Sequence, residues 1–263
     1  MASLRRRRQS PSPLPQILLV VAVVLVAGGV GWYWYQSRDE PEPPPAAPAD
    51  PAEAAPDPEE DPDVPPLELP ELSASDEFVR TVVARLSEHP QLAEWLANDE
   101  LIHRFVLVVV DLAGGSNPAA NVEFMVPSED FSVRESDGRL YIAPESHARF
   151  NLLAATFASL DTEGTVQLYR QLRPLIVEAY EELGIPDYTF DELLEMAIRN
   201  LLAVDVPDEP IEVVAHEEFY DFQDPEMEAR GGAEKALHRM GPENTRLVQA
   251  KLRELARELG IQP

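Results

Sequence analysis

Cysteine is absent from the 263-residue chain. Disulfide bonds, thiolate catalysis and zinc sites built on thiolates are therefore excluded. The absence also suits an oxidising compartment, where an unpaired thiol is a liability.

Positive charge is scarce, with 21 Lys and Arg against 48 Asp and Glu and a net charge of −27. Residues 1–13 carry +4, residues 36–70 carry −10 and residues 71–263 carry −21. A surface this acidic repels phosphate groups, so we expect neither nucleic acid nor anionic lipid as a partner of residues 71–263.

Motifs for catalysis, nucleotide binding and metal binding are also missing. The chain has no Gly-x-Ser-x-Gly, no Gly-x-Gly-x-x-Gly and no phosphate-binding loop. No histidine lies three or four residues from another, so no helical pair of metal ligands exists. We therefore assign no catalytic, cofactor-binding or metal-binding residue and expect no cofactor. The five histidines are His89, His103, His147, His216 and His238.

One long uncharged run is present near the beginning of the chain. Ile17–Tyr35 comprises nineteen residues without a charged side chain. As a helix it would be about 28 Å long, close to the hydrocarbon thickness of a bilayer. Trp32–Tyr35 close the run with aromatic rings of the kind found at membrane interfaces. We predict a transmembrane helix over residues 14–35, in contact with the lipid bilayer.

The flanking charges predict the orientation of this helix. Arg5–Arg8 precede it, and positive residues remain on the cytoplasmic side. Residues 1–13 are thus predicted to be a basic cytoplasmic tail, and the C-terminal domain to be translocated. The alternative is a cleaved signal peptide, whose apolar stretch is normally about 7–15 residues and ends in small residues. This run is longer and ends in bulky aromatic residues.

Residues 36–70 are predicted to be an acidic, proline-rich, disordered linker. Residues 41–70 contain twelve prolines, separated mainly by Asp, Glu and Ala. Proline removes backbone donors, like charges repel, and too little apolar surface is present for folding. At about 3.1 Å per residue in a polyproline II conformation, thirty residues would reach roughly 90 Å.

Residues 71–263 are expected to form a soluble domain that is mainly α-helical. Ser75 is a candidate N-cap for a helix that ends before His89-Pro90. A further helix is predicted from about Asn98 to Ala113 as the central buried helix. Its β-branched residues leave a strand at Val106–Val110 as the alternative.

One or two short β-hairpins are expected within this domain. Apolar residues alternate at Phe131 and Val133 and again at Leu140 and Ile142, on either side of the turn signal 136–139. A second short hairpin would join residues 211–214 to residues 219–222.

The later helices are predicted from their caps. Helix is expected from Pro144 to about Leu160, and again from Asp161 or Thr162 to about Leu183, with Pro174 as a kink. Thr189-Phe190-Asp191-Glu192 is a capping-box pattern.

Two helices are expected after the second hairpin, beginning at Asp224-Pro225 and Gly241-Pro242. The stripe Val248, Leu252, Leu255 and Leu259 resembles a heptad seam, but it is short and is assigned to core packing rather than to a coiled coil.

Five blocks of sequence resemble a bacterial family catalogued as a domain of unknown function, number 3014, over roughly residues 70–260. The blocks are Leu101–Val106, Tyr169–Leu175, Ala179–Gly184, Tyr220–Pro225 and Arg239–Asn244. The resemblance implies a bacterial inner-membrane protein with an anchored periplasmic helical domain, and it implies no activity or site residue. Gly231-Gly232 departs from the family pattern where a helix is expected.

Several residues in these blocks are candidates for binding. Arg170, Arg173 and the pair His103-Arg104 could hold a carboxylate or phosphate, although internal salt bridges are the favoured interpretation. Tyr220 and Phe222, with the block that begins at Arg239, could frame a groove, although core packing is favoured.

The sequence therefore favours a non-enzymatic protein-interaction module, held in the cell envelope, that binds an envelope protein or a second copy of itself. The alternatives are a carboxylate-dependent cell-envelope hydrolase and a small-ligand sensor. The hydrolase alternative predicts a cleft with two buried acids about 5–10 Å apart. Glu178, Glu181 and Glu182 lie near one another, but a solvated helix face explains them better.

Overall fold

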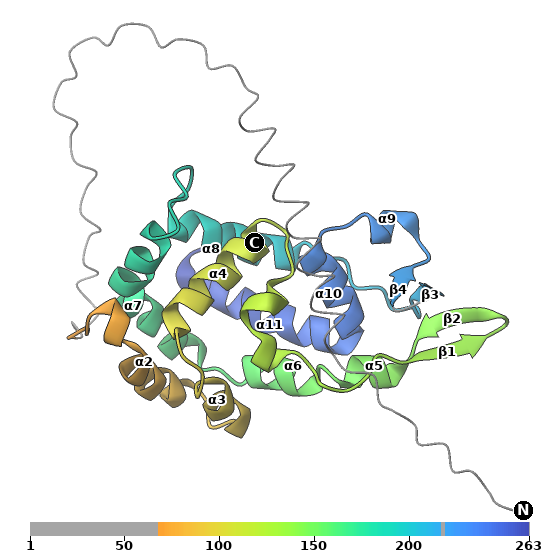
Figure 1. Ribbon diagram of the computed structural model, residues 1–263, viewed down its shortest axis with the longest axis horizontal. Coiled ribbons are helices and arrows are strands. Elements are labelled where there is room, and N and C mark those ends of the chain that lie inside the picture. Colours follow the sequence, from red (N-terminus) through yellow and green to blue (C-terminus); the bar gives the residue numbers. More distant parts are fainter. Residues whose placement is uncertain (1–67, 217–218, 263) are drawn as a thin grey trace, which may run out of the picture. The chain divides into compact units, whose positions relative to one another are not determined.

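The computed structural model describes residues 68–216 and 219–262 (Figure 1). These residues form helices and one small sheet. The α-helices are α2 (Asp76–Val83), α3 (Pro90–Trp95), α4 (Leu101–Ala113), α5 (Pro144–Ala148), α6 (Asn151–Ala158), α7 (Thr162–Glu181), α8 (Phe190–Leu202), α9 (Pro225–Glu228), α10 (Gly232–Met240) and α11 (Pro242–Leu259). Short 3-10 helices are η1 (Leu72–Ala74), η2 (Ala84–Leu86), η3 (Pro118–Asn121) and η4 (Glu123–Met125). The strands are β1 (Val133–Ser136), β2 (Arg139–Ile142), β3 (Glu212–Ala215) and β4 (Tyr220–Phe222).

Helix α4 lies at the centre of the first hydrophobic cluster, where it contacts α2, α7 and α8. Ile102, Val106 and Val109 form its buried face, and Val106 is only 1% exposed. The helix prediction is therefore confirmed, and the strand alternative at Val106–Val110 is wrong. Burial among three helices outweighs the weak preference of β-branched residues for strands.

Helix α11 is the centre of the second cluster and packs against α6, α7, α8 and α10. Val248, Leu252 and Leu255 are buried, and Leu259 is partly buried. The stripe is thus a core face of the domain. This confirms the prediction that it serves core packing rather than a coiled coil.

The four strands form one antiparallel sheet in the order β1-β2-β3-β4. Both predicted hairpins are present, and the first turns through Asp137 and Gly138, which have φ values of 54° and 73°. The pairing of Leu140 with Val213 joins the two hairpins. Ile142, Ile211, Val213 and Phe222 form a third hydrophobic cluster on one face of this sheet.

Two predicted helices are interrupted. The helix expected from Pro144 to Leu160 consists of α5 and α6, separated at Arg149 and Phe150. The helix begun at Asp224-Pro225 ends at Glu228, and α10 starts only at Gly232. The departure at Gly231-Gly232 therefore does mark a break.

The local capping signals are mostly confirmed. Asp161 accepts from the N–H of Gly164 at the start of α7, and Thr189 and Glu192 form the reciprocal capping box of α8. Pro174 lies inside α7, which continues to Glu181. Ser75 holds the N-cap position of α2 but its side chain makes no capping bond, because η1 precedes it and leaves Ser75 in the helical region.

The predicted tail 1–13, transmembrane helix 14–35 and most of the linker 36–70 lie outside the described residues. Among the helices of residues 68–216 and 219–262, none combines the length and apolarity needed to cross a membrane.

Candidate functional site

The sequence block Tyr169–Leu175, which lies on α7, forms a polar cluster with the first turn of α8. The Arg173 guanidinium donates from Nε at 3.0 Å and from Nη2 at 2.6 Å to Oδ2 of Asp191. The Tyr169 hydroxyl donates to Oδ1 of the same carboxylate. Arg170 donates from Nη2 to the backbone oxygen of Glu258 at 3.4 Å. For Arg173, the internal salt bridge is therefore confirmed.

The electrostatics of this cluster follow from its partial burial. Burial acts to raise the pKa of Asp191, but the hydrogen bonds from Arg173 and Tyr169 outweigh it, so the pKa lies below its ordinary value. Burial, together with the hydrogen bond to Asp191, raises the pKa of the Tyr169 hydroxyl. The cluster thus holds an ionised carboxylate that is already satisfied by two internal donors.

Aromatic side chains lie beside this cluster, around Phe190 at the start of α8. Its ring, 2% exposed, lies 5.7 Å from that of Phe105, 5.9 Å from that of Tyr180 and 6.5 Å from that of Tyr169. The rings connect α4, α7 and α8 through packing.

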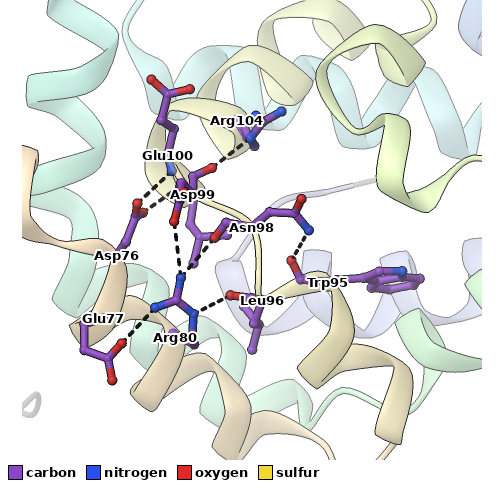
Figure 2. Close-up of polar contacts among 10 residues, drawn as sticks. Asp76, Glu77, Arg80, Trp95, Leu96, Asn98, Asp99, Glu100 and Arg104 are labelled. Carbon is purple, nitrogen blue, oxygen red and sulfur yellow. Dashed lines mark hydrogen bonds and ion pairs between the residues drawn. The ribbon is translucent and has the colours of Figure 1, made fainter.

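A second polar network surrounds the beginning of α4 (Figure 2). Glu100 has left-handed backbone angles, with φ 60° and ψ 38°, an uncommon conformation for a residue other than glycine. The Asp76 carboxylate, from α2, accepts from the N–H of Glu100 at 2.8 Å and from that of Leu101 at 2.9 Å. A distant aspartate therefore caps α4, which explains why the helix begins at Leu101 and not at Asn98.

Two arginines complete the network in Figure 2. Arg80 donates to the backbone oxygens of Leu96 at 2.6 Å and Asn98 at 3.1 Å. Arg104 donates to the backbone oxygens of Asp99 at 2.8 Å and Asn121 at 2.9 Å. Arg104, a sequence candidate for anion binding, thus holds the loop before α4 and the segment after it.

The blocks at Tyr220–Pro225 and Arg239–Asn244 contact each other. The Arg239 guanidinium lies 4.8 Å from the centre of the Phe222 ring and donates to the backbone oxygen of Tyr220 at 3.3 Å. Phe222 is buried. The two blocks therefore pack against each other through α10 and β4. They do not frame an open groove.

Asn244 continues this second block at the start of α11. Its amide nitrogen lies 2.9 Å from the backbone oxygen of His147 and 3.0 Å from Oδ1 of Asn151. The preceding Gly241 has φ 85°, a conformation that favours glycine. This corner therefore joins α5, α6, α10 and α11.

The histidines are dispersed over the fold. His103 lies 3.0 Å from Glu182 and His216 lies 2.9 Å from Asp221. His89 and His147 contact helix ends through their Nδ1 atoms, and His238 is buried. No cluster of three or more possible ligands that could hold a metal ion occurs among the residues that the structure describes.

Among the shallow hollows of the described surface are these two. One, of about 390 Å³, lies between η1, α4 and α7 and is lined by Glu71, Leu72, Ser73, His103, Glu178 and Glu182. The other, of about 270 Å³, is lined by Pro207, Glu209, Pro210, Ile211, Glu212, Gln223, Asp224 and Met227.

The hydrolase alternative can be compared with the carboxyl groups of the described residues. The buried polar side chains of residues 68–216 and 219–262 include no Asp or Glu. Four carboxyls have a shifted pKa, and hydrogen bonds from their neighbours lower the pKa in each case: Asp191, Glu192, Glu228 and Glu254. A glycosidase-type acid needs a raised pKa. The described residues therefore provide no pair of buried acids across a cleft.

Sequence reasoning missed Asp76 and Asp191. In the sequence, Asp191 is visible only as the third residue of the capping-box pattern Thr189-Phe190-Asp191-Glu192, and no local signal relates it to Arg173. Asp76 acts 25 residues away from its own position. Every buried side-chain nitrogen and oxygen within the described ranges has a partner.

The described residues form a mainly helical domain with a small antiparallel sheet. The family model described as a protein of unknown function, DUF3014, matches residues 101–256, and the chain belongs to this family. The five sequence blocks that resemble the family all lie within the matched range. No curated protein and no solved structure matches the chain.

Proposed function

We propose that this chain is a single-pass protein of a bacterial inner membrane whose periplasmic helical domain is a non-enzymatic interaction module. The observation that carries the proposal is the order of segments in the sequence. Four arginines precede nineteen uncharged residues, a proline-rich acidic stretch follows, and a domain capable of burying a core comes last.

The polar networks of the domain support a non-enzymatic role. Arg80, Arg104, Arg173 and Arg239 donate to groups of the domain itself. A tether that reaches roughly 90 Å in extended form suits a domain whose partner lies at a distance from the bilayer.

The topology can be tested because the chain has no cysteine of its own. Ser10→Cys and Ser136→Cys would each create a single thiol, one before the apolar run and one in the domain. A membrane-impermeant maleimide added to spheroplasts should label Ser136→Cys and leave Ser10→Cys unlabelled until lysis. The reverse pattern would show the orientation to be wrong, and recovery of both variants in the soluble fraction would refute the anchor.

The interaction role needs a separate measurement. The full chain, solubilised in detergent, should co-purify with a stable partner or a second copy. The matched control is residues 1–67 fused to an unrelated globular domain, which should recover neither. Failure to recover a partner under two or more solubilisation conditions would contradict the proposal.

A further inference from the structure

Strand β1 is one edge of the sheet, because it pairs with β2 and with no other strand of the described residues. The N–H of Ala143 donates to the backbone oxygen of Ser132 at 3.1 Å. In an antiparallel pair, the residues that bond to the neighbouring strand alternate. Arg134 and Ser136 therefore direct their peptide groups toward β2, whereas Val133 and Glu135 direct theirs outward.

The opposite edge, β4, is closed by side chains. The N–H of Phe222 donates to Oε2 of Glu228 at 2.9 Å, and the backbone oxygen of Tyr220 accepts from Arg239 at 3.3 Å. Glu228 and Arg239 thus occupy the places that a neighbouring strand would take. Blocking of one edge and not the other leaves β1 as the position where the sheet can grow.

The charged side chains of β1 are also unengaged. Arg134, Glu135 and Ser136 are exposed, and neither charged side chain makes a hydrogen bond or ion pair within residues 68–216 and 219–262. Figure 1 shows the β1–β2 hairpin extending beyond α5, with β1 on its outer side. Most arginines of the domain, such as Arg80 and Arg173, are engaged internally.

A second copy of the chain fits this edge poorly. The antiparallel register in which the outward-facing residues Val133 and Glu135 of both copies all pair with one another places Val133 opposite Glu135 of the other copy. Arg134 then lies directly opposite Arg134, and like charges in that position are destabilising. Two chains that each carry −27 also repel each other.

We propose that β1 is the docking edge for an extended segment of a partner protein, with an acidic residue opposite Arg134 and a basic residue opposite Glu135. The inference rests on the proposed function and identifies its interaction surface. The backbone groups of Val133 and Glu135 supply the hydrogen bonds, and the two charges select the sequence and register of the partner.

The experiment uses the full chain in its own cells, with a photo-crosslinking amino acid in place of Ser136. Irradiation should give an adduct with one partner protein, joined through a segment that contains neighbouring acidic and basic residues. Glu135→Pro removes an outward N–H without touching the β1–β2 ladder. It should lower the adduct yield on the order of fivefold to tenfold relative to Glu135→Gln, which keeps the N–H. Arg134→Glu should lower the yield as well.

Crosslinkers at other positions distinguish a failure of the docking edge from a failure of the proposed function. The same crosslinker in place of Leu152 or Leu247, both exposed on helices, reports contacts elsewhere on the domain. Partner adducts from the helical positions but not from Ser136 would overturn the docking edge and leave the interaction module intact. Adducts from none of the three positions would count against both.

Other outcomes at Ser136 also overturn the docking edge. One is an adduct between two copies of the chain, another is an adduct with the chain's own residues 36–67, and a third is equal yield from Glu135→Pro and Glu135→Gln. Amide exchange of both variants shows whether the β2–β3 pairing of Leu140 with Val213 is intact. A proline variant that keeps that pairing and the adduct contradicts the inference.

Discussion

Asp76 at the start of α2 caps α4, because its Oδ1 accepts the N–H of Leu101 at 2.9 Å. The same carboxylate accepts the N–H of Glu100, the residue with left-handed backbone angles. One side chain therefore both begins the central helix and holds the turn that precedes it.

Replacement of Asp76 should destabilise the domain. Asp76→Ala is expected to lower the free energy of unfolding by about 1–2 kcal/mol, because two N–H groups at the helix start lose their acceptor. The neighbouring Glu77→Ala is the control and should cost at most about 0.5 kcal/mol, since Glu77 makes only an exposed ion pair with Arg80. Urea unfolding followed by circular dichroism measures both, and equal effects would refute the cap.

The Asp191 cluster should make stability depend on pH. Its pKa is lower in the folded protein than the ordinary value of about 3.9, so the stabilisation is present at neutral pH and is lost as pH falls below about 4. Asp191→Asn should cost about 1–2 kcal/mol at pH 7, after allowance for the partial exposure of the ion pair. The difference in the free energy of unfolding between Asp191→Asn and the wild-type protein should shrink as the pH falls from 5 to 2.

Glu195→Gln is the control for this titration. Glu195 pairs with Arg199 one turn away at 2.5 Å on an exposed helix face. Its loss should cost roughly 0.3–0.5 kcal/mol at pH 7. A difference for Asp191→Asn that stays constant down to pH 2 would show that the charge of Asp191 contributes nothing.

The close approach of two loops should make Gly231 sensitive to substitution. A Cβ at Gly231 would lie 2.7 Å from the backbone oxygen of Gly115, and one at Gly232 would lie 2.9 Å from the backbone nitrogen of Asn117. Gly231→Ala is expected to cost about 1–3 kcal/mol, since backbone must move. Gly114→Ala meets only ordinary contacts of 3.5 Å or more, and its effect should stay within about 0.5 kcal/mol. Thermal unfolding compares the two, and a neutral Gly231→Ala would disprove the close contact.

Lys251 should be the most sensitive basic residue of α11. Its buried ammonium donates to the backbone oxygen of Leu160 at 2.9 Å, to Thr162 at 3.0 Å and to Glu254 at 2.7 Å. Lys251→Met leaves the Leu160 oxygen without a donor and should cost about 1–3 kcal/mol. Arg253→Met, on the exposed side of α11, should change stability by less than about 0.5 kcal/mol. Denaturant midpoints that coincide for the two variants would contradict this role.

Short-range features were predictable from sequence, whereas contacts between distant segments were not. The capping box of Thr189 and Glu192 involves residues three apart, so its chemistry is visible in four letters of sequence. The turn at Asp137-Gly138 is equally local. The pairing of Leu140 with Val213 spans 73 residues, and nothing near either residue specifies it.

The same distinction applies to the polar clusters. Arg173 was singled out from sequence and its engagement in an internal salt bridge was favoured, but its partner Asp191 was not identified. The departure from the family pattern at Gly231-Gly232 is visible in the sequence, but the close approach of Gly231 to the backbone oxygen of Gly115 on another segment is not. Both contacts depend on which surfaces the tertiary fold brings together.

The position of α11 has a consequence for the timing of folding. Its buried face covers Ala154 of α6 and Ile198 of α8, and it also contacts α7. All of these helices are translated before α11, so their apolar faces remain uncovered while the ribosome adds the residues between Leu202 and Pro242. A nascent chain at that stage is a substrate for chaperones and proteases, and it becomes resistant to them only once α11 has been synthesised and docked.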